Sequence, residues 1–89
     1  MTSERGEYSL TVSASFRKDL RKLPRENQIR VRQALGKILA DPYQGRKIRN
    51  AAVGQYRWRV GDYRIRYDIE GHQIQVLRVL KREDAYRRF

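Results

Sequence analysis

Four arginines alternate with apolar and aromatic residues between positions 55 and 69 of this 89-residue chain. The segment reads Gln-Tyr-Arg-Trp-Arg-Val, then Gly-Asp, then Tyr-Arg-Ile-Arg-Tyr-Asp-Ile. The arginines are Arg57, Arg59, Arg64 and Arg66. A planar guanidinium group can form two parallel hydrogen bonds with a phosphate, and it also stacks on nucleobases. The spacing therefore points to a site for a phosphate-containing ligand.

The Gly61-Asp62 pair predicts how these arginines are arranged. Gly-Asp between two alternating runs is typical of a two-residue hairpin turn. Such a turn places Arg59 opposite Arg64, and Arg57 opposite Arg66. Because side chains alternate between the two faces of a strand, all four arginines are expected on one face, and the aromatic and aliphatic residues on the other.

Two cross-strand pairs of like charge destabilise a sheet, by up to about 1 kcal/mol each. An anionic ligand would neutralise the four arginines, and RNA phosphate is the ligand we expect. The alternative is an exposed face whose charge is balanced by neighbouring carboxylates such as Asp68 or Glu83. The sequence leaves both interpretations open.

Other cations and one aromatic residue extend the predicted site. Interleaved aromatic and basic side chains are typical of sites for single-stranded RNA. The additional candidates for RNA contact are Arg46, Lys47 and Arg49 in the basic loop expected at 43–53, Arg66 of the hairpin, and Arg87 and Arg88 in the C-terminal segment that also contains Tyr86.

The sequence offers no familiar catalytic motif, and its carboxylates lack the spacing of metal ligands. Any phosphodiester cleavage is therefore expected to need no metal and no other cofactor. The 2′-hydroxyl of RNA would act as the nucleophile, and arginines would stabilise the charge that develops on the phosphate. Lys81, with a pKa depressed by surrounding cations, is a better candidate for the general base than any arginine. His72, the only histidine, lies in an expected turn and is predicted to take no part.

The charge of the whole chain agrees with a polyanionic partner. Lysine and arginine number 21 against 10 acidic residues, a formal net charge of +11. A field of this sign attracts polyanions and accelerates their binding, although excess charge can also serve solubility alone. The chain has no cysteine and no apolar run long enough to span a membrane, and its N-terminal residues do not resemble a signal peptide. We expect a cytoplasmic protein with no membrane partner.

The elements that must position these residues follow from hydrophobic periodicity. Residues 8–12 alternate as a strand, Phe16, Leu20 and Leu23 recur at helical spacing, and a second helix runs from Pro24 to Asp41-Pro42. The buried positions expected in the second helix are Val31, Ala34, Leu35, Ile38 and Leu39. Residues 74–80 form a last strand that has apolar residues at both odd and even positions, and therefore on both faces, as in a central strand. The prediction is a single α+β domain over 1–89 with the order β-α-α-β-β-β, an antiparallel sheet and a helical hairpin packed on one of its faces.

The segment 54–69 resembles the hairpin signature of the RelE/ParE superfamily of bacterial and archaeal toxins, and the resemblance continues through 76–82 and Tyr86. It implies a RelE-like catalytic set of Arg57, Arg59, Arg64, Arg82 and Tyr86. Arg57 and Arg59 stand where the best-known member has lysines. Lys81 stands where several relatives have a histidine, so a histidine general base is not available.

The leading functional hypothesis is a toxin that cleaves mRNA in the ribosomal A site without a metal and so inhibits translation. The resemblance implies a cognate antitoxin, expected to be acidic, through which the pair could contact operator DNA. The alternative within the superfamily is a ParE-like inhibitor of DNA gyrase. A third alternative is a nucleic-acid-binding module with no catalytic activity.

Overall fold

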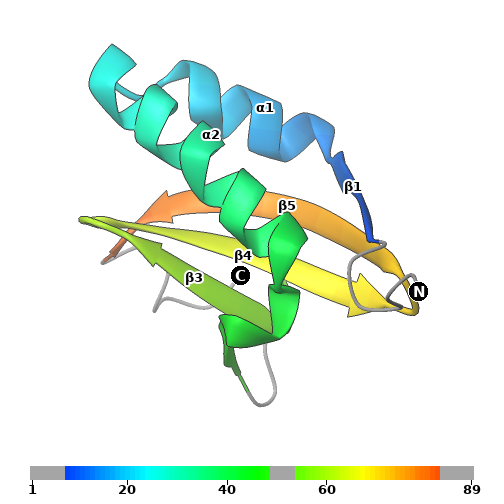
Figure 1. Ribbon diagram of the computed structural model, residues 1–89. Coiled ribbons are helices and arrows are strands. Elements are labelled where there is room, and N and C mark those ends of the chain that lie inside the picture. Colours follow the sequence, from blue (N-terminus) through cyan, green and yellow to red (C-terminus); the bar gives the residue numbers. More distant parts are fainter. Residues whose placement is uncertain (1–7, 49–53, 83–89) are drawn as a thin grey trace.

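Five strands form one sheet in the order β1-β5-β4-β3-β2, and both helices cover the same face of it (Figure 1). The computed structural model describes residues 8–48 and 54–82. In chain order the elements are β1 Ser9–Val12, α1 Ala14–Arg21, α2 Arg25–Ala40, a 3-10 helix η2 Pro42–Gln44, β2 Arg46–Lys47, β3 Tyr56–Val60, β4 Tyr63–Glu70 and β5 Gln73–Lys81. The α+β class and the helical hairpin on one face are confirmed.

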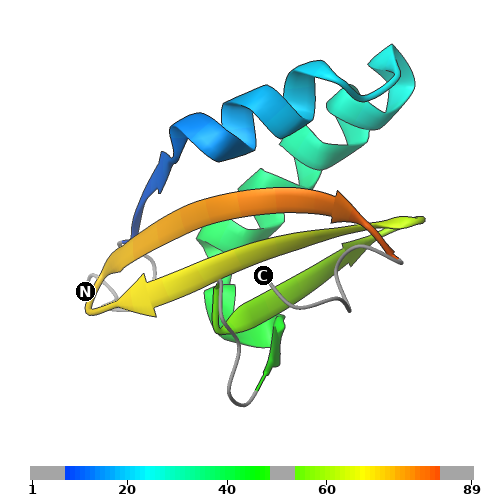
Figure 2. The same cartoon turned by 180° about the vertical axis from the view of Figure 1, so that it is seen from behind.

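The sheet is mixed, whereas the sequence predicted an antiparallel one. Strand β1 pairs with β5 in parallel, from Ser9 opposite Gln73 to Val12 opposite Val76, while the other neighbouring strands are antiparallel. Figure 2 shows β5 between β1 and β4. The two parallel strands lie near opposite ends of the chain, so no local pattern could indicate their relative direction.

The helices begin and end where the sequence suggested. The hydroxyl of Ser13 caps α1 by accepting a hydrogen bond from the Phe16 amide at 3.0 Å, and it donates to the Leu77 carbonyl at 2.8 Å. In α2, Val31, Ala34 and Ile38 are buried, as predicted. Leu39 was expected in the core as well, but it is 37% exposed because it lies at the margin of the apolar stripe, in the last turn.

The β3–β4 hairpin has the predicted register at every position. Arg57 pairs with Arg66 and Arg59 with Arg64 across a turn in which Gly61 adopts a left-handed φ of 59°. The face toward the helices includes Ile65 and Tyr67, both fully buried. The local pattern of alternation and turn residues was therefore enough to fix this part of the sheet.

A β-bulge explains the mixed pattern of β5. Arg66 pairs with Arg78 and the next residue, Tyr67, pairs with Val76, so Leu77 is an extra residue on β5. Val76 and Val79 are both buried toward the core, although strict alternation would place them on opposite faces. The strand is central, as predicted, and beyond the bulge the residues that face the core change from even-numbered to odd-numbered positions.

The predicted loop 43–53 contains ordered structure in its first half. Residues 42–44 form η2, and β2 pairs with β3 along the sheet edge. The Tyr67 hydroxyl donates to the Pro42 carbonyl at 2.6 Å, and a Cβ atom at Gly45 would collide with that hydroxyl. Glycine is therefore required where the chain crosses this buried ring. A two-residue strand is too short for its periodicity to be recognised in a sequence.

In the described segments, no helix combines the length and apolarity needed to cross a bilayer.

Candidate functional site

A row of arginines crosses the sheet on the face opposite the helices. Arg46 on β2 pairs with Arg57 on β3, Arg57 with Arg66 on β4, and Arg66 with Arg78 on β5. Directly paired residues share a face, so the four side chains originate on one side of the sheet. The sequence predicted the two central members. Arg46 was expected in a loop, and Arg78 was not predicted to join the row, because both placements depend on pairing between strands that the local pattern did not specify.

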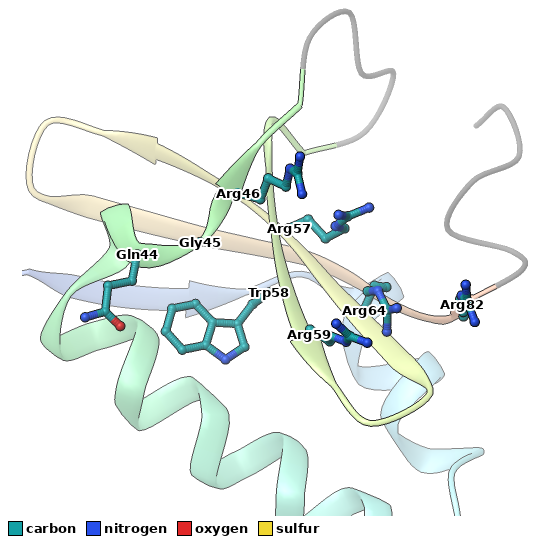
Figure 3. Close-up of a pocket in the computed structure, with 8 residues that line it drawn as sticks. All are labelled: Gln44, Gly45, Arg46, Arg57, Trp58, Arg59, Arg64 and Arg82. Atoms are coloured by element: carbon teal, nitrogen blue, oxygen red, sulfur yellow. The ribbon is translucent and has the colours of Figure 1, made fainter.

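A pocket of about 460 Å³ lies at the end of this row toward β2. Its walls consist of Gln44, Gly45, Arg46, Arg57, Trp58, Arg59, Arg64 and Arg82. Figure 3 shows Arg57, Arg59 and Arg64 on β3 and β4, with Arg46 on β2 and Arg82 at the end of β5. Trp58 and Gln44 lie on the other side of the β3 ribbon. Four of the predicted catalytic arginines are therefore brought together, and Arg46 joins them.

Three of the five pocket arginines carry exposed side chains: Arg46, Arg59 and Arg82. Among the described residues, none of these three guanidinium groups has a hydrogen-bond or ion-pair partner. Arg57 is half-buried. Unpaired cations that converge on one cavity are suited to bind an anion through charge-assisted hydrogen bonds.

Arg64 lines the pocket but is only 4% exposed. Its Nη1 donates to the carbonyls of Gly61 and Tyr63, at 3.0 Å each. Arg64 therefore holds the β3–β4 turn as well as forming part of the pocket wall. The four hairpin arginines share one face, as predicted, but Arg64 and Arg66 are buried because each turns back onto the protein's own backbone.

Arg66 is 5% exposed, and its Nη2 donates to the Gly54 carbonyl at 2.9 Å. Burial lowers its pKa from the ordinary value, the neighbouring Arg57 lowers it further, and Asp68 opposes the shift. Asp68 also accepts a hydrogen bond from the Gln55 amide at 2.6 Å. These contacts fix the start of β3. Asp68 therefore balances part of the arginine charge, as the alternative interpretation of the sequence suggested. The RNA contact predicted for Arg66 stays a prediction.

Arg82 is positioned by the hairpin turn, because its backbone amide donates to the Asp62 carbonyl at 2.7 Å. Its neighbour Lys81, predicted as the general base, is exposed and is not among the residues that line the pocket. Lys47 pairs with Tyr56 and lies with its ammonium 6.0 Å from the centre of that ring, so it belongs to the helix-side face rather than to the arginine row.

Arg78 is neutralised at the other end of the row. Its Nε lies 2.7 Å from Asp19 Oδ2 on α1, and this hydrogen bond is the main reason its pKa is raised. The same carboxylate oxygen accepts from the Val79 amide at 3.1 Å. Helix α1 thus covers the edge of β5 beyond the end of β1, and Arg78 is not one of the arginines that line the pocket.

Several predicted residues lie outside the described part of the chain: Arg49, Tyr86, Arg87 and Arg88, as does Glu83. In the part that is described, no cluster of three or more His, Cys, Asp or Glu side chains could hold a metal ion. Sequence reasoning missed Gln44, and it assigned Trp58 to the core alone. A polar residue directly before Gly45 and Arg46 was the available signal for Gln44.

Comparison with known proteins gives the family. The model of the ParE toxin of type II toxin–antitoxin systems matches residues 10–86. The Toxin RelE of Mycobacterium tuberculosis is 30% identical over 84 residues, which cover 90% of this chain and 87% of the relative. The chain belongs to the RelE/ParE superfamily of toxins. The resemblance predicted from the hairpin is thereby confirmed.

Other relatives of this toxin agree. The Toxin RelG of M. tuberculosis is 34% identical over 85 residues, covering 91% of this chain and 98% of the relative. The toxin is similar to a chain of the M. tuberculosis RelBE2 toxin–antitoxin complex, with a TM-score of 0.76, 30% identity and coverage of 85% and 99%. A chain of the Methanococcus jannaschii RelB–RelE antitoxin–toxin complex gives a TM-score of 0.67, 29% identity and coverage of 84% and 93%.

Proposed function

We propose that this toxin binds mRNA on the ribosome and cleaves it in the A site without a metal, which halts translation. The observation that carries the proposal is the pocket, in which five arginines from β2, β3, β4 and the end of β5 meet. The side chains of Arg46, Arg59 and Arg82 are exposed and unpaired among the described residues, so they are available to a phosphate. The sequence identity of 30% with the RelE toxin and 34% with the RelG toxin also supports mRNA cleavage as the function.

The chemistry requires little from the protein beyond charge and orientation. The 2′-oxygen attacks the adjacent phosphorus, the bond from phosphorus to the 5′-oxygen breaks, and a proton is transferred from the 2′-hydroxyl to a base while another reaches the leaving 5′-oxygen. Arg59 and Arg82 would stabilise the negative charge that builds on the phosphate. Arg64 would orient the turn that holds Arg82. Lys81 stays our candidate for the general base. Tyr86, which belongs to the catalytic set that the resemblance implies, would contact a nucleobase of the mRNA.

The proposal includes an acidic antitoxin as the inhibitory partner. Two structures similar to this chain are toxins in complex with antitoxins. A net charge of +11 favours rapid capture by an acidic, partly disordered segment that folds on the toxin surface. Contact with operator DNA would occur through the antitoxin.

A second candidate function is inhibition of DNA gyrase, which the match to the ParE toxin model favours. The two functions predict different cellular effects. Pulse labelling after induction of the toxin would show an early fall in protein synthesis if it cleaves mRNA, and an early fall in DNA synthesis if it inhibits gyrase.

The direct test uses purified toxin and ribosomes programmed with a defined mRNA, with the cut ends mapped by primer extension. We expect cuts within the A-site codon, lost in Arg59→Ala and kept in Arg17→Ala, an exposed arginine of α1 outside the pocket. Intact mRNA together with inhibition of supercoiling by purified gyrase would replace the leading proposal with the second one.

A further inference from the structure

Part of the pocket wall is not explained by phosphate binding. Besides the arginines, the cavity is lined by the indole of Trp58 and the side chain of Gln44 (Figure 3). Trp58 is half-buried and packs on the margin of the core, and Gln44 is exposed. Neither the indole N–H nor the Gln44 amide forms a hydrogen bond with a described residue. An aromatic ring and a free amide beside a cationic cluster call for a ligand with a flat, hydrogen-bonding part.

The fold fixes the backbone positions that carry these two side chains. Trp58 pairs with Ile65 within the β3–β4 hairpin. The backbone N–H of Gln44 donates to the Asp41 carbonyl at 3.2 Å. The 3-10 helix η2 that contains Gln44 is attached to the core by the hydrogen bond from the Tyr67 hydroxyl to the Pro42 carbonyl. Gly45 allows the chain to pass directly over that hydroxyl. Buried structure therefore sets the backbone at Gln44 and Trp58, which reduces the cost of ordering the backbone on binding.

The edge of β3 connects this wall to the arginines. Strand β2 pairs only with Tyr56 and Arg57, so within the described residues the edge of β3 from Trp58 to Val60 has no neighbouring strand. A ligand can cross this edge and contact both faces of β3. The cavity of about 460 Å³ lies within the range of roughly 300–1,000 Å³ found for small-molecule sites, and so can hold a nucleotide unit.

We propose that Gln44 and Trp58 form a nucleobase subsite, in which one base of the RNA strand stacks on the indole and presents its edge to the Gln44 amide. The phosphates on either side of that base would pair with the pocket arginines. A glutamine amide carries both donors and an acceptor, so it distinguishes bases by their edges. Stacking on an aromatic ring accepts any base. Trp58 thus supplies affinity for an unpaired base, and Gln44 supplies the preference among bases. This inference rests on the proposed RNA function and names the recognition element of the same site.

The test measures binding of a short single-stranded RNA by fluorescence anisotropy at low salt. The oligonucleotides carry a 2′-deoxy substitution that prevents cleavage, and they form a set with each of the four bases, or an abasic unit, at one position of a uniform sequence. For the wild type we expect the abasic unit to weaken binding roughly 5-fold or more, as for loss of one stacked base. Trp58→Ala should abolish this difference, and Trp58→Phe should retain most of it.

Gln44→Ala should keep the abasic effect but level the affinities for the four bases. Because Gln44 is exposed, this variant tests the proposal even if Trp58→Ala fails to fold. Ile29→Ala, an exposed position on α2 away from the pocket, serves as the control and should match the wild type. A wild type that binds the abasic and complete strands equally, or a Gln44→Ala base profile identical to that of the wild type, would overturn the subsite. Failure of the wild type to bind RNA at all, and to cleave it on ribosomes, would instead reject the proposed function.

Discussion

Arg59 and Arg64 face each other across the hairpin, but their surroundings give them different roles. Arg59 is exposed with no partner among the described residues, whereas Arg64 is buried and donates to two backbone carbonyls. The cross-strand pairing of like charges would by itself predict that removal of Arg64 relieves repulsion and leaves stability unchanged or higher. The hydrogen bonds of Arg64 reverse that expectation for one of the pair.

We predict that Arg59→Ala lowers cleavage of ribosome-bound mRNA by about 10²–10³-fold, as for loss of one donor to developing negative charge, with little change in stability. Arg64→Ala should lower cleavage too, but it should also reduce the free energy of unfolding by about 1–3 kcal/mol, since the buried Tyr63 carbonyl and the partly buried Gly61 carbonyl lose their donor. Single-turnover cleavage and urea unfolding separate the two effects. Equal stability of the two variants would contradict the role of Arg64 in the turn, and Arg17→Ala is the control.

Tyr67 provides a pH-dependent prediction. Burial raises the pKa of its hydroxyl above the ordinary value of 10.0, and the neighbouring Tyr56 raises it further. A raised pKa means that the folded state keeps the proton after the unfolded chain has lost it. The stability from this group is therefore complete below about pH 10 and declines as the pH rises above that value.

Tyr67→Phe should reduce the free energy of unfolding by about 1 kcal/mol at pH 7, because the hydrogen bond to Pro42 is lost. The difference from the wild type should shrink as the pH is raised beyond about 10. Urea unfolding across a pH series measures both values, with the exposed Tyr43→Phe as the control. A constant difference over the whole series would show that the hydroxyl proton is not responsible.

Among the elements, the hairpin was fully predictable and the sheet edges were not. Alternation plus the Gly61-Asp62 turn determines every pair from Tyr56–Tyr67 to Val60–Tyr63, because the partners are close in sequence. The parallel β1–β5 pair, the short β2 and the bulge at Leu77 depend on contacts between distant segments. Local periodicity carries no information about such contacts.

The candidate site likewise contains residues that local sequence patterns predicted and residues that they did not. Arg57, Arg59 and Arg64 share the pocket because the hairpin register brings them together, and Arg82 joins them through the Asp62 carbonyl. Arg46 and Gln44 enter from a segment that was expected to be a loop. The positions of Gln44 and Arg46 depend on Gly45, which fits over the buried ring of Tyr67. Such tertiary packing cannot be recognised from the local sequence pattern.

The contact between α1 and β5 is expected to contribute to the stability of the fold. Asp19 accepts hydrogen bonds from Arg78 and from the Val79 amide. Asp19→Ala should therefore lower the free energy of unfolding by about 1–3 kcal/mol, since it leaves a strand amide and a partly buried guanidinium without their acceptor. A double-mutant cycle with Arg78→Met measures how much of this loss belongs to the ion pair. Glu26→Ala, exposed in the first turn of α2, is the control, and a loss no larger than its own would refute the role of Asp19.

For the whole molecule, a net charge of +11 predicts RNA binding that weakens steeply with salt. The logarithm of the affinity should fall linearly with the logarithm of salt concentration, by about 0.7 for each phosphate neutralised on a single strand. Arg46→Gln should reduce that slope by about 0.7 if Arg46 contacts one phosphate in the pocket. Lys37→Gln, exposed on α2 outside the pocket, should leave the slope unchanged. Equal slopes for both variants would mean that the RNA follows the general field of the protein and does not enter the pocket.

The parallel pairing of β1 with β5 has a consequence for how the chain acquires its structure. Residues 9–12 have no partner in the sheet until residues 73–76 exist, so the first strand to be synthesised is among the last that can be paired. Contacts separated by most of the chain form late, because the entropy of closing so long a loop must be overcome first. The β3–β4–β5 meander can form from local contacts, and β1 then docks with α1 against its edge. A nascent or truncated chain that lacks β5 therefore has neither its complete core nor Arg82 in the pocket, and it should be harmless to the cell that makes it.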